Sequence, residues 1–469
     1  MKVTLVMPPF YMKNRYDKGL EKIGSILPPL GLLYIASVLE KDGHEVVVVD
    51  SQFHSWSHER TISECRKTKP DVVGIYCNTS NYTYAVQLAD LLKKMGMTTV
   101  LGGPHVTTSP SEVLSNDGVD YVVFGEGEYA MAELVSYLSG KKKKIAAIKG
   151  VGYKDSSGRP IINEPRKFIE NLDEIPFPAR HLVDIKKYRP SPNQYKRLPN
   201  TTIMASRGCP FNCSFCDTKR IWGRGYRYRS VENVIDEIKH LVNDYGIKDV
   251  NFWDDLWGVN KEWVNNFCDA VERDKLDITW TCECRVNTVS PEILKIMKSA
   301  GCWAIFYGVE SLDQDVLDAI NKKTNVDMIE NAIRWTKDAG IEVRANFILA
   351  LPRETPAKVR KMVGRLKRLN PDYVKFNVLT PYPGTRIYEE IKDGKWGTMV
   401  SEKYDKLTGY FATFVPKGYK NVDEINRIKK YAYRSYYMRP SFIISKMMSV
   451  RNYEDLKRIV KGGLAILSI

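Results

Sequence analysis

The feature that most constrains the fold of this 469-residue chain is an alternation of short, apolar, β-branched runs with longer amphipathic segments. Parallel strands covered by helices on both faces have this continuous apolar character. In the first 140 residues such runs occur at 3–7, 45–49, 71–76, 98–101 and 121–124. Amphipathic stretches lie between them and end at glycines such as Gly43 and Gly96. The pattern predicts an α/β fold, with an open, doubly wound, Rossmann-like domain over residues 1–140.

A second block of alternation begins at residue 201 and has longer repeating units. Its apolar runs lie at 201–206, 249–253, 278–282, 303–308, 343–349 and 373–379. Six βα units of this length predict a partial (β/α)6 barrel over 201–390, with its chemistry at the carboxyl ends of the strands. The proline-rich segment 141–200 is typical of a linker. Residues 391–469 are predicted to form a basic, mainly helical C-terminal region.

The composition limits the kinds of partner and the cellular compartment that we expect. A formal net charge of +15 indicates attraction to an anionic partner, and 43% hydrophobic residues exclude wholesale disorder. Neither a signal peptide nor an apolar run long enough to span a bilayer is visible. Nine cysteines in such a chain fit reduced thiols in a cytoplasm. We therefore expect a cytoplasmic protein, with peripheral contact to the inner face of a membrane left open and nucleic acid disfavoured because no recognition fold is visible.

Three cysteines lie close together directly after the first predicted barrel strand. Cys209, Cys213 and Cys216 have the spacing C-x3-C-x2-C. Thiolates are soft ligands suited to iron–sulfur clusters or zinc. With three ligands and no fourth nearby, one iron of a cluster would stay open to a cofactor. A zinc knuckle or buried thiols are the alternatives, and zinc is disfavoured because structural zinc sites usually have four protein ligands.

This cysteine loop, with Phe215 before its last cysteine, resembles the signature of the radical S-adenosylmethionine (SAM) superfamily. The resemblance implies that the three thiolates hold a [4Fe-4S] cluster and that SAM binds the open iron. It also implies cleavage of SAM to a 5'-deoxyadenosyl radical, for which a one-electron reductant such as ferredoxin or flavodoxin is needed.

Later strand ends match the same superfamily. Asp254 and Asp255 stand where many members carry a Gly-Gly-Glu motif, which implies that their carboxylates bind the SAM ammonium group. Helix capping is the alternative role for this pair. The resemblance implies that Arg285 binds the SAM carboxylate, unless it is a surface arginine.

The fourth and fifth strand ends continue the match. Glu310 and Ser311 are implied to bind the ribose hydroxyls, and Ala350 stands where members usually have glycine. Alanine makes a close backbone approach to the adenine less certain at this position. The loop at 381–385 is also typical of the subclass, and Tyr382 is expected to contact substrate.

Four further cysteines raise the question of a second cluster. Cys282 and Cys284 alternate on one predicted strand and point the same way, while Cys268 and Cys302 lie in neighbouring segments. An auxiliary cluster is one reading. We interpret them as packed free thiols.

In the first domain, loops rich in glycine and short hydroxyls follow the predicted strands. In an open parallel sheet, ligands bind at these carboxyl ends. The loops resemble those of the cobalamin (B12)-binding domain that precedes the barrel in one radical SAM subclass, and together with the barrel the resemblance covers about residues 1–390. It implies cobalamin contacts from Thr79, Ser80, Gly102, Gly103, Thr107, Gly125 and Glu126.

One departure concerns the axial ligand of cobalt. The Asp-x-His-x-x-Gly motif is absent, so a bound cobalamin would lack a histidine ligand from that motif. His105 lies in a Gly-Pro turn and is interpreted as a hydrogen-bonding residue. A vestigial scaffold that covers the active site is the alternative for the whole domain.

The tail, residues 417–461, interleaves basic and aromatic residues and suits an anionic interface or packing on the barrel. It resembles the C-terminal region of relatives that act on hopanoid lipids and tetrapyrroles. The leading prediction is cobalamin-dependent methylation of an unactivated carbon of a hydrophobic or lipid-like small molecule. The alternative predictions are cobalamin-independent radical oxidation, cyclisation or C–C coupling on a lipid or tetrapyrrole, and a non-catalytic cofactor-binding protein.

Overall fold

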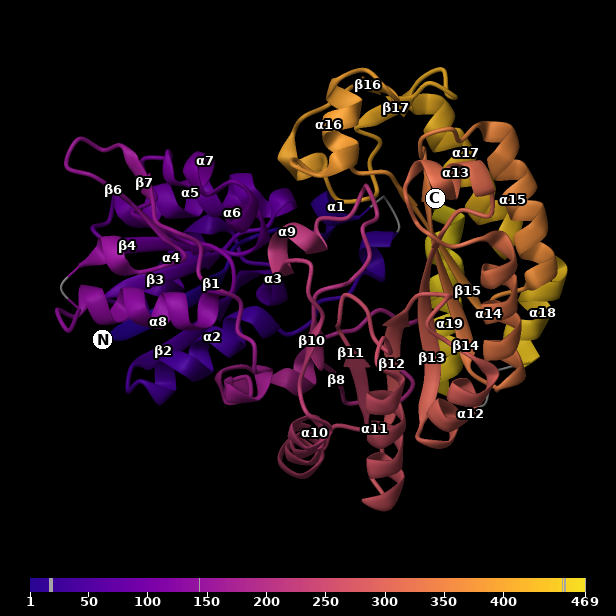
Figure 1. The fold of residues 1–469 in the computed structure, drawn as a ribbon, viewed down its shortest axis with the longest axis horizontal. Coiled ribbons are helices and arrows are strands. Elements are labelled where there is room, and N and C mark those ends of the chain that lie inside the picture. Colours follow the sequence, from indigo (N-terminus) through magenta and orange to yellow (C-terminus); the bar gives the residue numbers. More distant parts are fainter. Residues whose placement is uncertain (17–19, 143, 449, 451–452, 469) are drawn as a thin grey trace. The chain divides into compact units, whose positions relative to one another are not determined.

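The computed structural model describes residues 1–16, 20–142, 144–448, 450 and 453–468. The chain forms two compact units (Figure 1). Unit 1 comprises residues 1–11, 26–188 and 218–228, and unit 2 comprises residues 12–25, 189–217 and 229–469. Two short segments therefore belong to the unit that their position in the sequence does not suggest.

Unit 1 is built on a seven-stranded sheet of order β2-β1-β3-β4-β5-β6-β7. Its first five strands in this order are parallel, as predicted, and β6 and β7 are antiparallel. The strands are β1 (Lys2–Met7), β2 (Glu45–Asp50), β3 (Val72–Tyr76), β4 (Thr98–Gly102), β5 (Tyr121–Val123), β6 (Val151–Lys154) and β7 (Pro160–Ile162). The order reverses between β1 and β3, which is where ligands bind in such sheets.

Helices cover both faces of this sheet. On one face α2 packs against α8, and on the other α4 and α5 bury the cluster around Cys65, Leu88 and Leu101. The helices of unit 1 are α2 (Leu30–Lys41), α3 (Ser51–His54), α4 (His58–Thr68), α5 (Tyr82–Lys93), α6 (Pro104–Thr108), α7 (Pro110–Leu114), α8 (Gly127–Leu138) and α9 (Thr218–Trp222).

The segment 141–200, expected to be a linker, holds more structure than its composition indicates. Its strands β6 and β7 extend the sheet of unit 1, and residues up to 188 belong to that unit. β6 has four residues and ends in Lys154, and β7 has three mostly exposed residues, so both lack the long apolar run that identified the parallel strands.

Unit 2 contains a six-stranded parallel sheet of order β15-β14-β13-β12-β11-β8. This is the sheet of the predicted partial barrel. Its strands are β8 (Asn200–Ile203), β11 (Asp249–Phe252), β12 (Thr279–Cys284), β13 (Cys302–Glu310), β14 (Glu342–Leu349) and β15 (Tyr373–Val378), and the short strands β9 (Ser206–Arg207) and β10 (Arg227–Tyr228) flank the cysteine loop in sequence.

The connecting helices of unit 2 cover one face of the sheet (Figure 1). An aromatic core fills the space between β11, β12 and α11, where Phe252, Phe267 and Trp280 meet edge to face. The helices are α1 (Met12–Arg15), α10 (Val231–Tyr245), α11 (Lys261–Arg273), α12 (Pro291–Ser299), α13 (Gln314–Ala319), α14 (Val326–Asp338), α15 (Pro356–Leu369), α16 (Arg386–Lys392), α17 (Val422–Tyr437), α18 (Pro440–Met448) and α19 (Tyr453–Ser468).

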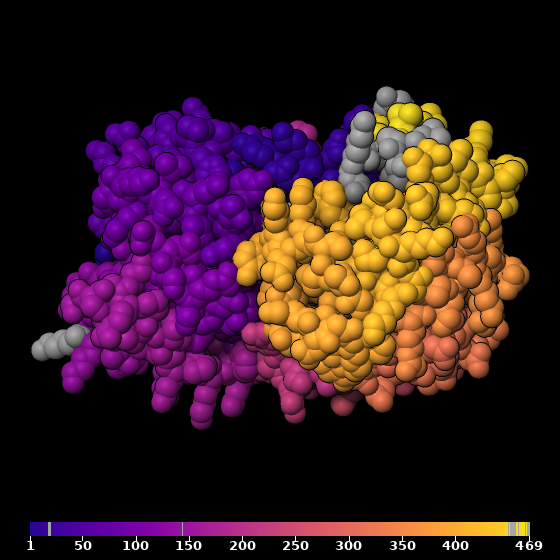
Figure 2. Space-filling view, turned by 90° about the horizontal axis from the view of Figure 1, so that it is seen from above, coloured from indigo at the N-terminus to yellow at the C-terminus, as the bar shows by residue number. Residues whose placement is uncertain are grey.

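The C-terminal region is mainly helical but also contains the antiparallel pair β16 (Gly397–Met399) and β17 (Phe414–Pro416), whose surface is orange in Figure 2. Helix α17 protects the edge strand β15. The Tyr433 hydroxyl accepts from the Phe376 N–H (3.1 Å) and donates to the Phe376 carbonyl (3.2 Å). Tyr437 does the same for Val374, at 2.8 and 2.6 Å. These tyrosines of the basic tail therefore satisfy an exposed sheet edge.

Helices α18 and α19 present large apolar side chains to solvent. Ile444, Met447, Met448, Val460 and Leu464 are each at least half exposed. Across the described ranges, none of the helices combines the length and the apolar character needed to cross a membrane.

Candidate active site: the cysteine loop and the strand ends around it

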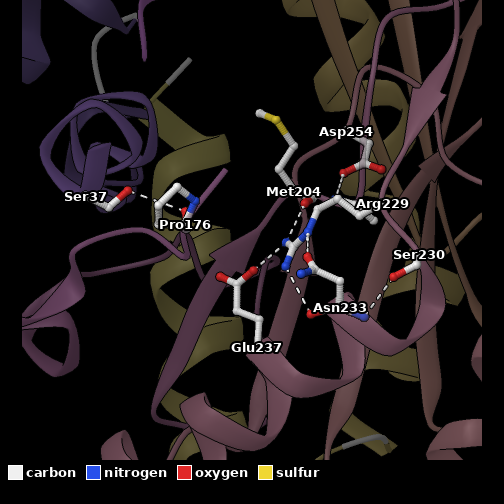
Figure 3. A network of polar contacts seen from close by, with 9 residues as sticks. Ser37, Pro176, Met204, Arg229, Ser230, Asn233, Glu237 and Asp254 are labelled. Atoms are coloured by element: carbon white, nitrogen blue, oxygen red, sulfur yellow. Dashed lines mark hydrogen bonds and ion pairs between the residues drawn. The ribbon is translucent and has the colours of Figure 1, made fainter. Parts of the chain in front are cut away.

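A buried ion pair holds the strand that leads into the cysteine loop (Figure 3). Arg229 pairs with Glu237 of α10, and their side chains are 6% and 0% exposed. The same guanidinium donates to the Met204 carbonyl (3.0 Å) and to the Asn233 side chain (2.6 Å). The Arg229 N–H donates to the Ala205 carbonyl at 2.8 Å. Residues 204–205 are thus fixed directly before β9 and the cysteines.

The cysteine loop itself is anchored through its backbone to the end of α13 and to the first turn of α16. The Ser214 N–H donates to the Ile320 carbonyl (2.9 Å), and the Ile387 N–H donates to the Ser214 carbonyl (3.0 Å). The Asn321 side-chain amide donates to the Asn212 carbonyl (2.6 Å). Phe215 packs against the apolar cluster that contains Ile320, Ile387 and Phe414. Hydrogen bonds and packing from later parts of unit 2 therefore hold this loop in place.

The three thiols stay accessible on this anchored loop. Cys209 and Cys213 are half-buried and Cys216 is exposed. Across the described residues, no three His, Cys, Asp or Glu side chains converge on a site for a single metal ion. A [4Fe-4S] cluster takes each thiolate on a different iron, so its ligands do not have to meet at one point. The donor chemistry of three accessible thiols on one rigid loop fits such a cluster.

Arg285 reaches the cysteine loop from the end of β12. Its guanidinium lies 3.4 Å from the Cys213 sulfur and 3.8 Å from the ring centroid of Phe211, and it also donates to the Lys322 carbonyl. Lys322 in turn pairs with Glu310 at 2.8 Å, and both side chains are buried. The predicted residues Arg285 and Glu310 are therefore brought together with the cysteines through Lys322.

The two predicted aspartates have different environments. Asp254 is buried and accepts from the Ala205 N–H (2.9 Å) and the Ser206 hydroxyl (2.6 Å). Burial raises the pKa of Asp254 to about 7 in spite of these hydrogen bonds. Asp255 is exposed and accepts a long hydrogen bond, 3.4 Å, from the Gly208 N–H. Asp254 thus supports the loop, while Asp255 presents its carboxylate to solvent next to it.

The strand ends near the expected ribose and adenine carry strained backbone. Glu310 and Ala350 have φ values of +66° and +60°, in the left-handed region that favours glycine. The Ala350 N–H donates to buried Glu354 (2.6 Å), which also accepts from the Tyr419 hydroxyl (2.5 Å). Alanine therefore adopts a left-handed backbone conformation that favours glycine. Ser311 is buried, and its hydroxyl accepts from the Asp313 N–H.

The additional cysteines form a packed group on the helix side of the sheet. Cys282 and Cys284 have their sulfurs 3.7 Å apart and are buried with Cys302 and Cys268. Burial raises the pKa of Cys268 and of Cys282 well above its usual value. Neutral thiols fit the interpretation as packed residues.

In unit 1 the predicted cobalamin loops lie at the carboxyl ends of β3, β4 and β5. Thr107 accepts from the Gly125 N–H (3.0 Å) and donates to the Gly103 carbonyl (3.0 Å), which ties two loops together. Gly103 has φ +123°, and a Cβ there would lie 2.6 Å from the Cys77 carbonyl oxygen. Thr79 and Ser80 are half-buried next to them. The loops form a glycine-lined edge that permits close backbone approach.

Two buried residues of this edge form hydrogen bonds within the protein. Glu126 is buried and accepts from the Ile169 N–H (2.6 Å) and from Arg227 (2.9 Å). His105 is buried within hydrogen-bond distance of the Thr79 hydroxyl (3.3 Å), and burial lowers its pKa to about 4. His105 is therefore a hydrogen-bonding residue, as interpreted from the sequence, and Glu126 secures the segment that follows β7.

Sequence reasoning missed the residues that support the site. Arg229, Glu237, Asn321 and Lys322 carry no motif spacing, because their partners are distant in sequence or are backbone carbonyls. Tyr382 was predicted to contact substrate, and its hydroxyl lies 3.5 Å from the Leu407 carbonyl. Among these residues, Lys322 could have been found from the sequence, because it is a basic residue that follows the predicted ribose-binding strand end.

Comparison with protein families matches two parts of the chain. A B12 binding domain matches residues 17–135, and the radical SAM superfamily matches residues 203–366. An uncharacterized methyltransferase of Pyrococcus horikoshii is 33% identical over 99% of this chain and 98% of its own length. The anaerobic magnesium-protoporphyrin IX monomethyl ester cyclase of Rubrivivax gelatinosus is 28% identical over 97% of this chain and 82% of its own length.

A solved structure shares the fold over the whole chain. The radical SAM methyltransferase TsrM of Kitasatospora setae, with cobalamin and a [4Fe-4S] cluster bound, matches with a TM-score of 0.73, at 16% identity, over 100% of this chain and 98% of that chain. The chain belongs to the radical SAM superfamily, in the subclass with an N-terminal B12-binding domain. It is a radical SAM enzyme, and its cofactors are a [4Fe-4S] cluster, SAM and cobalamin.

Proposed function

We propose that this enzyme methylates an unactivated carbon of a hydrophobic small molecule, with SAM as radical source and methyl donor. The observation that carries the proposal is the end-to-end similarity to a protein named as a methyltransferase, with a B12-binding domain and a radical SAM domain in one chain. Bound together, the cluster, SAM and cobalamin supply a 5'-deoxyadenosyl radical and a cobalt carrier for the methyl group.

The chain's own residues would divide the work of holding these cofactors. Cys209, Cys213 and Cys216 would ligate the cluster. Asp255 is the accessible carboxylate for the SAM ammonium group, while Asp254 keeps the loop in place. Arg285 and the Glu310–Lys322 pair set the polar surface beside the cluster, and Ser311 and Phe215 complete it.

In unit 1 the loop residues Thr79, Ser80, Gly102, Gly103, Thr107 and Gly125 would hold cobalamin. Their support is the absence of bulk at the glycines and the half-buried hydroxyls beside them. The basic chain would also suit a small acidic electron donor of the flavodoxin or ferredoxin type, through charge complementarity.

The test is anaerobic reconstitution with iron, sulfide and hydroxocobalamin, followed by metal analysis of the desalted protein. About one cobalt and about four irons per chain are expected. Cys213→Ala should lose the visible absorption of the cluster, whereas Cys65→Ala, a buried thiol of α4, should keep it. Iron without cobalt would refute the cobalamin-dependent reaction.

A second candidate is radical oxidation or cyclisation of a tetrapyrrole, favoured by the similarity to the cyclase of Rubrivivax gelatinosus. The mass of the product separates the two. With SAM that carries a deuterated methyl group, methylation transfers the label to the product, and cyclisation does not.

Peripheral membrane contact is part of the proposal for a lipid-like substrate. Its support is the exposed apolar residues Ile444, Met447 and Met448 of α18, next to Lys446. Co-sedimentation with phosphatidylglycerol vesicles, and its loss in Met447→Glu, would support it, and no binding to these vesicles at low salt would refute it.

A further inference from the structure

Two charged residues that no motif identified point into the interior of unit 2. On β12, Trp280, Cys282 and Cys284 face the helices, as the contact of Trp280 with Phe267 of α11 shows. On β15, Phe376 faces α17, where its ring lies 5.2 Å from Tyr433. Side chains alternate along a strand, so Glu283 and Lys375 point to the opposite, inner face of the sheet.

The strand register places both residues close to the proposed SAM site. Lys375 pairs with Asn346, which pairs with Gly308, while Glu283 pairs with Phe306. Along the strand direction Glu283 therefore lies one inner-facing residue before Lys375, on a strand three places away in the sheet. A Cβ on Gly308 would be 2.7 Å from the Glu310 carboxylate and 3.2 Å from the Lys322 ammonium. This layer of the inner face therefore adjoins the Glu310–Lys322 pair.

Within the described part of the chain, the side chains of Glu283 and Lys375 have neither a hydrogen bond nor an ion pair. The Lys375 ammonium lies 5.2 Å from the ring centroid of Tyr410, and Tyr410 packs on Tyr16 at 5.1 Å. Both charged side chains are reachable by solvent, yet burial is the main cause that raises the pKa of Glu283 to about 7 and lowers the pKa of Lys375. Solvent access and partial loss of hydration occur together where side chains line a concave inner surface.

A charged side chain that faces the inner surface of the sheet without a counter-ion among the described residues is suited to bind a group of opposite charge. The inner-face neighbours Phe306 and Ile348 are apolar, which suits the rest of a hydrophobic molecule.

We propose that Lys375 binds a carboxylate on an otherwise hydrophobic substrate, to which Glu283 in its protonated form donates a second hydrogen bond. The inference rests on the proposed function only in placing the substrate beside SAM. It excludes a neutral hydrocarbon or a simple alcohol as the preferred substrate. The ammonium donates a charge-assisted hydrogen bond to the carboxylate, and the Tyr410 ring stabilises the ammonium from its other side.

The test compares binding of decanoate and 1-decanol to the reconstituted protein with SAM present and without reductant, by isothermal titration calorimetry. Since no turnover is involved, the result does not depend on whether methyl transfer occurs. We expect decanoate to bind at least about tenfold more tightly than 1-decanol, the ratio of one charge-assisted hydrogen bond. Lys375→Met should abolish this preference while 1-decanol binding is retained.

Matched variants separate binding from folding. Lys361→Met removes an exposed lysine of α15 and should keep the preference, and Lys375→Arg should keep most of it. Glu283→Gln should weaken decanoate binding less than Lys375→Met. Equal affinity for the two probes, no binding of decanoate to the wild-type protein, or an unchanged preference in a folded Lys375→Met protein would each overturn the proposal.

Discussion

Removal of the Glu237 carboxylate tests how strongly the start of the cysteine loop depends on its buried ion pair. Glu237→Gln keeps the shape of the side chain but removes the carboxylate charge that pairs with the Arg229 guanidinium, whose side chain is 6% exposed. Breaking a buried pair in this way costs about 3–5 kcal/mol. A loss of about 3 kcal/mol lowers the folding equilibrium constant more than about 100-fold.

Urea unfolding followed by tryptophan emission is the assay, because seven of the nine tryptophans lie in unit 2. The double variant Arg229→Met, Glu237→Leu should recover part of the loss, since it removes both charges. It will not recover all of it, because the Met204 carbonyl loses its donor. As a control, Lys239→Ala breaks an exposed pair with Asp274 and should cost less than about 1 kcal/mol.

Iron content after reconstitution supplies a second measurement. Because Arg229 fixes residues 204–205 directly before the cysteines, Glu237→Gln should lower bound iron together with stability. A free energy of unfolding within about 1 kcal/mol of wild type would contradict the reasoning, and so would full recovery of stability in the double variant.

Tyr433→Phe leaves the Phe376 N–H and carbonyl unpaired and should lower the free energy of unfolding by about 1–3 kcal/mol in urea titration, whereas Tyr431→Phe, at an exposed tyrosine, should not. Ala350→Val should cost more than about 2 kcal/mol in the same assay because a β-branched residue is strained at φ +60°, while Ala350→Gly should stay within about 1 kcal/mol of wild type. The pKa of Asp254 is raised to about 7 in the folded state, so its contribution to stability is fully present below pH ~4 and is lost as pH rises through 7; Asp254→Asn should flatten the fall in urea midpoint between pH 5 and 7.5. Removal of iron with a chelator should leave the circular dichroism spectrum unchanged, because protein hydrogen bonds hold the loop at Ser214 and Asn212, and loss of the spectrum would refute this.

The parallel strands were predictable because each is buried on both faces and reads as an apolar run. β14 was expected at 343–349 and spans Glu342–Leu349. The strands β6 and β7 escaped prediction because they lie at a sheet edge, where burial no longer imposes the apolar pattern. The sequence left open whether the tyrosines of α17 form an anionic interface or pack on the barrel, since nothing in it shows that their hydroxyls reach the edge of β15.

Some residues of the site could be predicted from the sequence and others could not. The cysteine spacing identified the cluster loop because adjacent ligands leave a short motif. Glu283 and Lys375 are far apart in sequence and share the inner face of the sheet only through strand register, so no spacing could reveal them. Asn321 donates to the Asn212 carbonyl and the Lys322 carbonyl accepts from Arg285, and such backbone partners leave no trace in the pattern of side chains.

Two residues that look equivalent in a motif can have different roles. The solvent exposure of their polar atoms distinguishes a structural role from a ligand-binding one. Asp254 and Asp255 are neighbours with the same side chain, yet Asp254 is consumed by Ala205 and Ser206, whereas the Asp255 carboxylate is open to solvent. Loss of Asp254 should therefore lower stability and iron content together. Loss of Asp255 should weaken SAM binding while the protein keeps its urea midpoint. By the same distinction Glu126 belongs to the scaffold, because Arg227 and Ile169 occupy its carboxylate. Lys375, whose ammonium lies over the Tyr410 ring and has no ion pair among the described residues, is the residue proposed to bind ligand.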